Sequence, residues 1–318
     1  MSRKKLVIIG ASGLTGFKLA KLASSRYHVY GTYKNRQFRM DSVEAVHLDI
    51  TDVSEMANFF YAVKPDIIVN TSALHNVDYC ETHQDEAFLV NVSSVRALAL
   101  QAEKLGAKLV HISTDYVFDG KSNSKYKEND PTSPANFYGK TKLLSEEILA
   151  QFPNCLILRS SVIYGWTPLE SVGLNSSSGK PVNFALWALN TLAKGEVLKI
   201  VTDQFSSPTL ADNLAEAIMA MIARNVKGIL HVAGLTCVNR FEFTRRIVSS
   251  FGYPENQVTP VQSNDLKQVA TRPKKTCLDC SKAESLGLKL LTLDESLHRM
   301  RKDIEMHSPK LIGPHLHV

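Results

Sequence analysis

Short apolar runs alternate with longer stretches of helical periodicity along the first half of the chain. Runs of apolar and β-branched residues predict strands at residues 5–9, 28–33, 43–48, 66–70, 108–112 and 155–158. Apolar positions three and four residues apart predict helices between them, at residues 17–25, 53–63, 87–105 and 135–149. Strands that alternate with helices are typical of an α/β fold, in which right-handed crossovers build a doubly wound parallel sheet.

The pattern is less regular beyond residue 164. Helices are expected at residues 182–193, 209–224 and 240–251, with strands at residues 198–201 and 228–232. Residues 173–179 are rich in Gly and Ser, which predicts a flexible loop over a neighbouring crevice. Residues 308–318 lack periodicity and are expected to form a mobile tail.

Polar residues follow three of the predicted strands. Asn70 leads into Thr71, Ser72 and Ala73, and the pairs Ser113-Thr114 and Ser160-Ser161 follow two later strands. Ligands of doubly wound sheets bind beyond the carboxyl ends of the strands. These segments are therefore expected to converge on one crevice.

Gly10, Gly13 and Gly16 lie between the first predicted strand and the first predicted helix, with Ser12 and Leu14 inside the motif. Glycines in this order let the backbone approach a pyrophosphate, and the helix N-terminus supplies free N–H groups and a positive dipole end. The alternative is a tight turn that binds nothing. Strand, glycine turn and helix together favour a dinucleotide site.

Tyr138 and Lys142 are four residues apart in a predicted helix, so their side chains share one face, roughly 6 Å apart at Cβ. A phenol has an unperturbed pKa of about 10. We expect the Lys142 ammonium to favour the phenolate and lower that pKa. With Thr114 upstream, the pair then suits proton exchange with a substrate oxygen. Taken alone, the pentapeptide also fits a packed Tyr and a solvated Lys.

Two basic residues follow the second predicted strand, where an NAD-binding unit usually has an acid for the ribose 2′-hydroxyl. Lys34 and Arg36 instead favour a 2′-phosphate, which predicts NADP(H) as the cofactor. The alternative is a solvated basic loop.

The composition is that of an ordinary soluble globular protein, with 318 residues, 44% hydrophobic and 21% charged. No apolar run approaches the eighteen or so residues of a membrane span. Five cysteines predict reduced thiols and a cytoplasmic location. The net charge of +6 is spread thinly, which suits small anionic ligands and gives no support for nucleic-acid binding.

No metal site is predicted. Cys277 and Cys280 form a single pair without a second pair or a His at zinc spacing, which favours coincidence over a metal or redox site. His315 and His317 are expected to be solvated in the tail.

The motifs and the change in pattern predict two parts. Residues 1–163 and 198–233 are expected to form an NADP-binding Rossmann domain. Residues 164–197 and 234–307 are expected to form a smaller, interleaved substrate-binding lobe.

Several longer stretches resemble the extended short-chain dehydrogenase/reductases, and within them the dTDP-4-dehydrorhamnose reductase family. They include GASGLTG from Gly10, KPDIIVNTSALHNVDYCE from Lys64, STDYVFDG from Ser113, YKENDPTSPANFYGKTK from Tyr126 and DQFSSPT from Asp203. The resemblance covers about residues 4–300.

The resemblance implies an NADPH-dependent reduction of the 4-keto group of a nucleotide-linked deoxysugar, as in dTDP-L-rhamnose synthesis. It implies that Thr114, Tyr138 and Lys142 are the catalytic residues. The implied cofactor contacts include Asp49, Ile50, Thr71, Ser72 and Ala73. The implied substrate contacts are Asp115, Tyr116, Phe118, Asn183 and Arg272.

Two positions depart from the family pattern. Leu14 stands where bacterial members usually have Gln, and Val162 where they usually have Trp, an aromatic surface for the sugar. With the segment LDCSK from Leu278, these changes make the chain also similar to the regulatory beta subunit of methionine adenosyltransferase.

Two functions are therefore predicted. One is a reductase of a nucleotide-sugar. The other is an NADP-binding regulatory subunit, whose partner would be a methionine adenosyltransferase catalytic subunit. The complete Thr, Tyr and Lys set favours the enzyme. The oligomeric state stays open, with a homodimer as one option.

Overall fold

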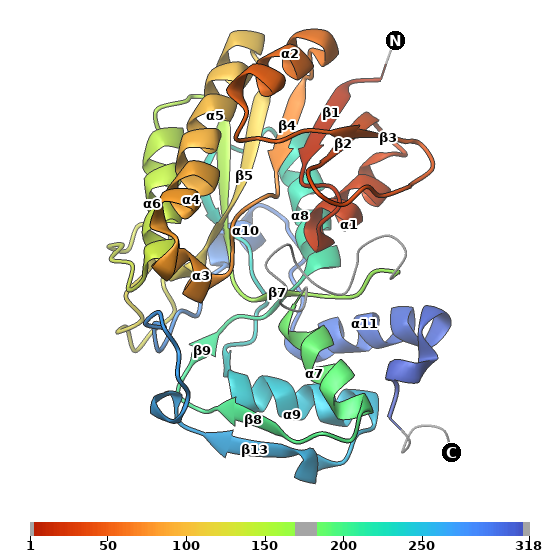
Figure 1. The fold of residues 1–318 in the computed structure, drawn as a ribbon, viewed down its shortest axis with the longest axis vertical. Helices are drawn as coiled ribbons and strands as arrows, with labels where there is room; N and C mark the ends of the chain where they lie inside the picture. The colour runs from red at the N-terminus through yellow and green to blue at the C-terminus, as the bar shows by residue number, and fades with distance from the viewer. Residues whose placement is uncertain (1–2, 169–182, 314–318) are drawn as a thin grey trace.

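A seven-stranded parallel sheet forms the centre of the protein in the computed structural model, which describes residues 3–168 and 183–313 (Figure 1). All six neighbouring strand pairs run parallel. The α/β fold predicted from the alternation of strands and helices is thereby confirmed. The strands follow the order β11 (Gly228–His231), β6 (Cys155–Ser160), β5 (Lys108–Thr114), β4 (Ile67–Asn70), β1 (Lys5–Ile9), β2 (His28–Tyr33) and β3 (Val43–His47).

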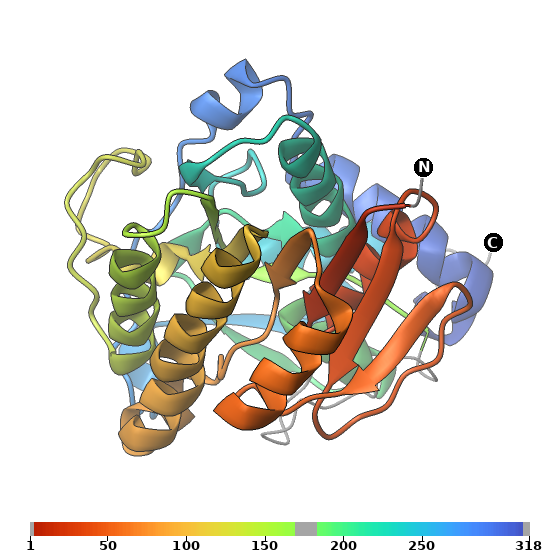
Figure 2. The same ribbon diagram turned by 90° about the horizontal axis from the view of Figure 1, so that it is seen from above.

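Helices cover both faces of this sheet (Figure 2). Successive residues of a strand point to opposite faces. Leu6 and Ile8 of β1 therefore share a core with α1 (Leu14–Ala23), α8 (Ala211–Ala223) and α10 (Ser281–Ser285). Val7 and Ile9 pack instead with α2 (Val53–Val63), α5 (Ser94–Leu105) and α6 (Phe137–Leu149). Continuous apolar runs are what a sheet buried on both faces requires.

A smaller lobe has its own core and lies below the sheet in Figure 1. It contains α7 (Phe184–Ala193), α9 (Arg240–Phe251), α11 (Leu293–His307), β8 (Leu198–Val201) and β13 (Val258–Val261). Two short strand pairs lie between the two parts: β7 (Ile163–Tyr164) with β10 (Thr209–Leu210), and β9 (Phe205–Ser206) with β12 (Val238–Asn239).

The expected boundary at residue 198 needs correction. Strand β8 pairs with β13 rather than with the large sheet, and Leu198, Ile200 and Leu210 belong to the core of the small lobe. The chain rejoins the main core at α8, and β11 is the strand that returns to the sheet. An apolar run of four residues cannot indicate which sheet it will join.

The predicted mobile tail is also partly wrong. Leu311 and Ile312 are buried against the small lobe, and the Gly313 backbone N–H donates a hydrogen bond of 2.7 Å to the Phe251 carbonyl. Residues 314–318, with His315 and His317, lie outside the described residues, as does the predicted loop at residues 173–179. None of the helices in residues 3–168 and 183–313 is long and apolar enough to cross a membrane.

The cysteines are not all reduced, contrary to expectation. Cys237 and Cys277 form a disulfide with their Cα atoms 5.5 Å apart, at a separation of 40 positions in the sequence. Cys280 is a free, buried thiol, so the C-x-x-C spacing does not mark a pair of bonded residues. A pairing over 40 residues depends on the fold and leaves no local signal.

Candidate active site

Three neighbouring strands end in polar residues at one edge of the sheet. Strand β4 ends at Asn70, β5 at Thr114 and β6 at Ser160. The register places Asn70 beside His111 and Thr114 beside Ser160. The predicted convergence at the carboxyl ends is therefore present.

The glycine loop after β1 has the shape that a pyrophosphate needs. A Cβ atom on Gly16 would lie 2.3 Å from the Gly10 carbonyl oxygen and 2.8 Å from Thr71 Oγ1, so a larger residue would push the loop apart. Gly13 caps α1 without a side-chain hydrogen bond, and the first turn carries no acid. The free N–H groups and positive end of this helix suit an anion.

Other residues predicted at the cofactor surround this loop. Thr71 Oγ1 donates a 2.7 Å hydrogen bond to the Ile9 carbonyl. A Cβ atom on Gly10 would lie 3.1 Å from Ser72 Cβ, so Ser72 packs closely against this turn. Ala73, which follows Ser72, and Ser12 of the glycine loop are both partly exposed. Leu14 is buried at the start of α1, and its contact with the cofactor stays a prediction.

Lys34 already has a protein partner. Its Nζ lies 2.6 Å from Asp49 Oδ2, and both side chains remain partly exposed. Burial alone would raise the pKa of Asp49, but hydrogen bonds from Lys34 and Thr51 outweigh it and lower the pKa. Ile50, the next residue, packs against the core beneath the sheet. A 2′-phosphate near this loop would therefore compete with Asp49 for Lys34.

Helix α6 brings Tyr138 against the end of β5. Asn136 caps the helix, accepting a 2.9 Å hydrogen bond from the Gly139 N–H. A Cβ on Gly139 would lie 2.3 Å from the Tyr116 carbonyl oxygen, so glycine permits the close approach. The rings of Tyr116 and Tyr138 then meet edge to face with centroids 6.2 Å apart.

Lys142 is buried and has two hydrogen-bond partners on β5, neither of which is Tyr138. Its Nζ lies 2.8 Å from His111 Nε2 and donates a 2.7 Å hydrogen bond to the Ile112 carbonyl. Only 1% of Lys142 is exposed, so water does not solvate the amine. The protonation of this lysine is therefore set by His111 and its neighbours.

The hydrogen bonds around His111 require a neutral Lys142. Asn70 Oδ1 accepts the Ser72 N–H at 3.1 Å, which turns the Asn70 amide nitrogen toward His111 Nδ1 at 3.2 Å. An amide nitrogen only donates, so Nδ1 accepts and the ring proton is on Nε2. Nε2 then donates to Lys142, which must offer a lone pair.

The electrostatics agree with this hydrogen-bond pattern. Burial lowers the pKa of Lys142 to about 7, although the charge of Glu146 opposes the shift. Burial, and then the neighbouring Lys142, hold the pKa of His111 well below its usual value. Burial thus favours the neutral form of both groups, and Lys142 titrates close to neutral pH.

The expectation that Lys142 lowers the pKa of Tyr138 is wrong for this arrangement. Burial raises the pKa of Tyr138 above its ordinary value, and a hydrogen bond with Thr114 opposes that effect. Lys142 is directed to His111 and Ile112 instead. Spacing along a helix puts two residues on one face but does not choose their partners.

Two of the predicted substrate contacts are interior residues. Phe118 is fully buried, stacked on Tyr126 at 4.2 Å and covered by the Arg159 guanidinium at 5.1 Å, and its contact with a substrate stays a prediction. Asp115 is also buried, and its carboxylate accepts hydrogen bonds from the Thr114, Ser161 and Thr276 hydroxyls.

Asn183 and Arg272 are near the crevice but engaged by the protein. Asn183 caps α7 by accepting the Leu186 N–H at 3.1 Å, and its amide donates to the Gly165 carbonyl at 2.9 Å. Arg272 forms an ion pair of 2.8 Å with Asp78 of α3 (Val77–Thr82) and also binds a backbone carbonyl.

Val162 has an unusual backbone for a β-branched residue. Its φ is +43°, in the left-handed region that such residues rarely occupy. The side chain packs against the core of the small lobe, where β6 turns into β7. Strain of this kind persists only where the surrounding structure enforces it, and it clusters at functional sites.

Sequence reasoning missed three residues of this region: His111, Asn91 and Arg240. Asn91 lies in a π-helical turn (Leu89–Ser93) between α4 (Gln84–Phe88) and α5. Its amide holds the Leu74 backbone on one side and the Thr141 hydroxyl of α6 on the other. The sequence did offer a signal for His111, which is a polar residue inside the otherwise apolar run of β5.

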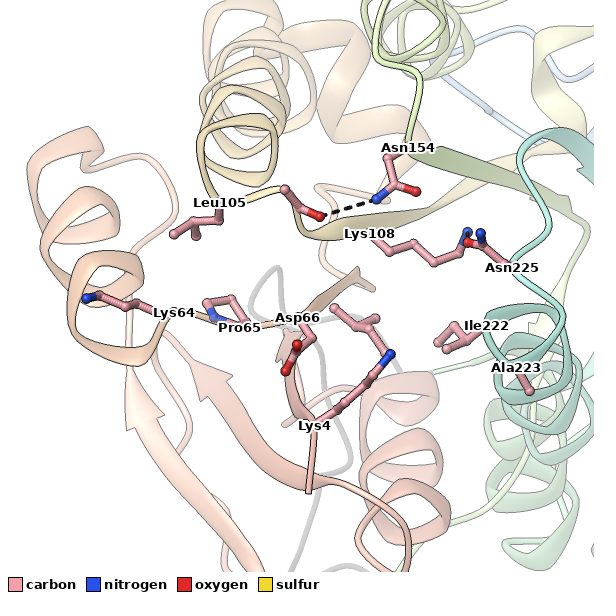
Figure 3. A pocket seen from close by; sticks show the side chains of 12 residues that line it. Lys4, Lys64, Pro65, Asp66, Leu105, Lys108, Asn154, Ile222, Ala223 and Asn225 are labelled. Atoms are coloured by element: carbon pink, nitrogen blue, oxygen red, sulfur yellow. Dashed lines mark hydrogen bonds between the residues drawn. The ribbon is translucent and has the colours of Figure 1, made fainter. Parts of the chain in front are cut away.

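A cavity of about 500 Å³ lies at the opposite, amino-terminal edge of the sheet (Figure 3). Lys108 points across it and donates to Asn225 Oδ1 and to the Val226 carbonyl, at 3.2 and 2.7 Å. Lys64, which ends α2, is directed away from the cavity. The ends of α2, α5 and α8 meet here, and lysines complement such C-termini. This cavity is therefore distinct from the crevice.

The chain matches the family described as the RmlD substrate binding domain over residues 4–306. It is 31% identical over 294 residues to a probable low-salt glycan biosynthesis reductase of Haloferax volcanii, covering 91% of this chain and 95% of that protein. It is 30% identical to the bovine (Bos taurus) methionine adenosyltransferase 2 subunit beta, covering 90% and 83%.

A solved structure with the same architecture is that of dTDP-4-dehydrorhamnose reductase from Bacillus anthracis in complex with NADP. It superposes with a TM-score of 0.83 at 28% identity, covering 95% of this chain and 99% of the other. Both the large sheet and the small lobe fall within the shared part.

Proposed function

Since the chain belongs to the RmlD substrate-binding domain family, we propose that it is an NADPH-dependent reductase of the 4-keto group of a nucleotide-linked deoxysugar. The family match and the related reductases support the reaction class. We assign the cofactor to the part built on the large sheet and the sugar to the small lobe. We also propose that the protein works in the cytoplasm, with a homodimer as one option for its assembly.

The observation that carries this proposal is that Tyr138 of α6 meets Thr114 at the carboxyl end of β5, while Lys142 of the same helix is bound to β5. Thr114 ends β5, and Tyr138 reaches it from α6 with the Thr114 hydroxyl as its hydrogen-bond partner. A protein without chemistry at this edge would have no need of a phenol at Thr114 and a buried lysine on the same helix.

The residues fit the cofactor. The glycine loop leaves no room for a Cβ at Gly16, and the uncapped start of α1 can hold the diphosphate. Lys34 and Arg36 would hold the 2′-phosphate of the adenosine, and Thr71 to Ala73 would line the crevice beside it. When bound, NADPH supplies the hydride for the sugar carbonyl carbon.

Tyr138 would give its proton to the developing alkoxide at the sugar O4, while the Thr114 hydroxyl donates a hydrogen bond to the same oxygen. A neutral Tyr138 is the form required for that step, and its raised pKa keeps it protonated. Lys142 is held by His111 and the Ile112 carbonyl at this edge, and we assign it to the nicotinamide ribose of the bound cofactor.

NADPH oxidation in the presence of dTDP-4-dehydrorhamnose tests this function. We expect absorbance at the reduced nicotinamide band to fall with wild-type protein, and to fall much more slowly with Tyr138→Phe. Absence of turnover with this sugar and with the corresponding UDP- and GDP-linked 4-keto sugars would contradict the proposal.

A second function is supported by the relative of the regulatory class at 30% identity. In that case the chain would bind NADP without rapid turnover and associate with a methionine adenosyltransferase catalytic subunit. A pull-down with that subunit, in parallel with the oxidation assay, separates the two functions. Association without turnover would favour regulation.

A further inference from the structure

We propose that Arg240 binds the diphosphate of the nucleotide-sugar. This inference rests on the proposed function and names the anchor of its substrate. Arg240 was not among the residues expected from the sequence, and the arginine that was expected, Arg272, is held by Asp78.

The backbone of Arg240 is firmly placed. Arg240 is the first residue of α9, directly after the cap Asn239, whose strand β12 pairs with β9. The Arg240 N–H donates a 3.1 Å hydrogen bond to the Gln204 carbonyl. The side chain therefore begins from a rigid element, which is what precise ligand binding requires.

The guanidinium has a donor to spare. Arg240 Nη1 is buried, yet within residues 3–168 and 183–313 it has no hydrogen-bond partner. The group lies over the face of the Phe184 ring, 5.0 Å from its centroid. An unpaired buried donor lowers the stability of the fold, and a charged donor lowers it more than a neutral one, so the unpaired Nη1 calls for an explanation. A bound anion provides one.

Other arginines of the region already have acidic partners. Arg159 is paired with Glu146 in the core at 2.7 Å, and Arg272 is paired with Asp78 at 2.8 Å. Asp115, an acid whose charge interacts with that of Arg240, accepts hydrogen bonds from three hydroxyl groups. Arg240 thus adds a charge that no direct ion pair cancels in the described part of the chain.

The position matches the far end of the proposed substrate. Arg240 lies beside Tyr116, whose ring meets the ring of Tyr138 at 6.2 Å. With the sugar O4 at Tyr138, the linked diphosphate would extend past Tyr116 toward Arg240. A planar guanidinium can bind phosphate oxygens through two parallel hydrogen bonds.

The test measures dTDP, UDP, GDP and ADP binding by titration calorimetry with NADP present. For the diphosphate that binds wild-type protein, we expect Arg240→Met to weaken affinity by about 10- to 100-fold, as for lost charge-assisted hydrogen bonds. Arg240→Lys should recover part of it. The control is Arg245→Met, on the same helix, where the side chain is exposed and paired with surface acids.

Each outcome is decisive. Equal affinity of wild type and Arg240→Met overturns this inference and leaves the reductase proposal standing. A wild-type protein that binds none of the four diphosphates overturns both. If Arg240→Met does not fold, as judged by its circular dichroism, Arg240→Gln keeps the polar contacts and removes only the charge. Unchanged NADP affinity in the variants shows that the effect is confined to the substrate side.

Discussion

At the scale of single residues, the buried amine of Lys142 is the most unusual group at the proposed site. The Lys142 amine lies between His111 and a backbone carbonyl, where water cannot stabilise its charge. Taking a neutral amine out of water costs less than taking out an ammonium. His111 and Asn70 are therefore positioning residues, since they hold Lys142 in its neutral form through one ordered chain of hydrogen bonds.

This arrangement predicts how stability depends on pH. The folded pKa of Lys142 is about 7, below its unfolded value of about 10.4, so the unfolded state binds more protons between these pH values. The free energy of unfolding should rise with pH through this window, by a few kcal/mol at most. Urea unfolding of wild type and Lys142→Met at pH 7, 8 and 9 measures it. A rise of the same size in Lys142→Met would assign it to another group.

Tyr138 is expected to act as the general acid. Tyr138→Phe should lower turnover by about 10²- to 10⁴-fold while leaving the fold and NADP affinity unchanged. Thr114→Val should have a smaller effect, because it removes one hydrogen bond to the reacting oxygen. Tyr61→Phe, at an exposed position on α2, is the control. Steady-state NADPH oxidation measures all three, and unchanged turnover in Tyr138→Phe would mean that another group supplies the proton.

We expect Lys34 and Arg36 to decide the choice between NADP and NAD. NADP should bind more tightly than NAD, and Lys34→Ala with Arg36→Ala should remove most of the difference. For Lys34 alone we expect a loss of about 1 to 2 kcal/mol, since the phosphate must displace Asp49 from an exposed pair that is itself worth little. Fluorescence titration measures both affinities. Equal affinity of wild type for NADP and NAD would refute the assignment.

At the scale of elements, contacts at the first turn of helix α6 determine its position. Asn136 caps it and also donates to the Thr271 carbonyl at 2.8 Å, while Gly139 lets it touch the backbone at Tyr116. The π-helical turn around Asn91 contacts the same helix from the other side. Together these contacts decide where Tyr138 stands relative to β5.

Gly139→Ala tests this placement. In an ordinary helix the change would stabilise by up to 1 kcal/mol or so. Here the new methyl group would lie 2.3 Å from a carbonyl oxygen, so we expect α6 to shift and turnover to fall by at least tenfold. Lys140→Ala, at the exposed neighbouring position, is the control. Full activity of Gly139→Ala would show that Tyr138 tolerates the displacement.

Elements of the large sheet were predictable, while several elements of the small lobe were missed. β1 and β2 begin and end where their apolar runs do, because both faces of these strands are covered. Helix α11 was overlooked, although Leu293, Leu297, Met300 and Ile304 recur at helical spacing and Thr292 with Glu295 forms a capping box. Strand β13 contains a proline and pairs with β8 at the edge of a two-stranded sheet, so its sequence gives little indication of a strand.

At the scale of the whole molecule, the disulfide between Cys237 and Cys277 joins two segments that are 40 positions apart in the sequence. Cys237 precedes β12 and α9, which carries Arg240, and Cys277 follows Thr276, whose hydroxyl binds Asp115. The bond therefore connects the proposed substrate anchor with the end of β5. The disulfide also limits the conformations that the 40-position segment between the two cysteines can adopt in the unfolded chain.

Reduction of this disulfide should lower stability. Loop-closure entropy for a separation of 40 residues predicts a loss of about 3 to 5 kcal/mol, an upper value because the reduced chain keeps some structure. Thermal unfolding with and without a phosphine reductant measures it. Cys237→Ser should already have the lower melting temperature and should not respond to the reductant. A wild-type protein that is equally stable when reduced would contradict the prediction.

The sequence by itself determined the α/β order, the glycine turn after β1 and the gathering of polar residues at the carboxyl ends of β4, β5 and β6. These features follow from periodicity and from turns of a few residues, so neighbours along the chain suffice to specify them. Only the tertiary structure decided which partner each side chain takes. His111 with Lys142, Asp78 with Arg272 and Cys237 with Cys277 are 31, 194 and 40 residues apart. Burial and pairing at such separations depend on the whole packed chain, and so do the pKa values that they set.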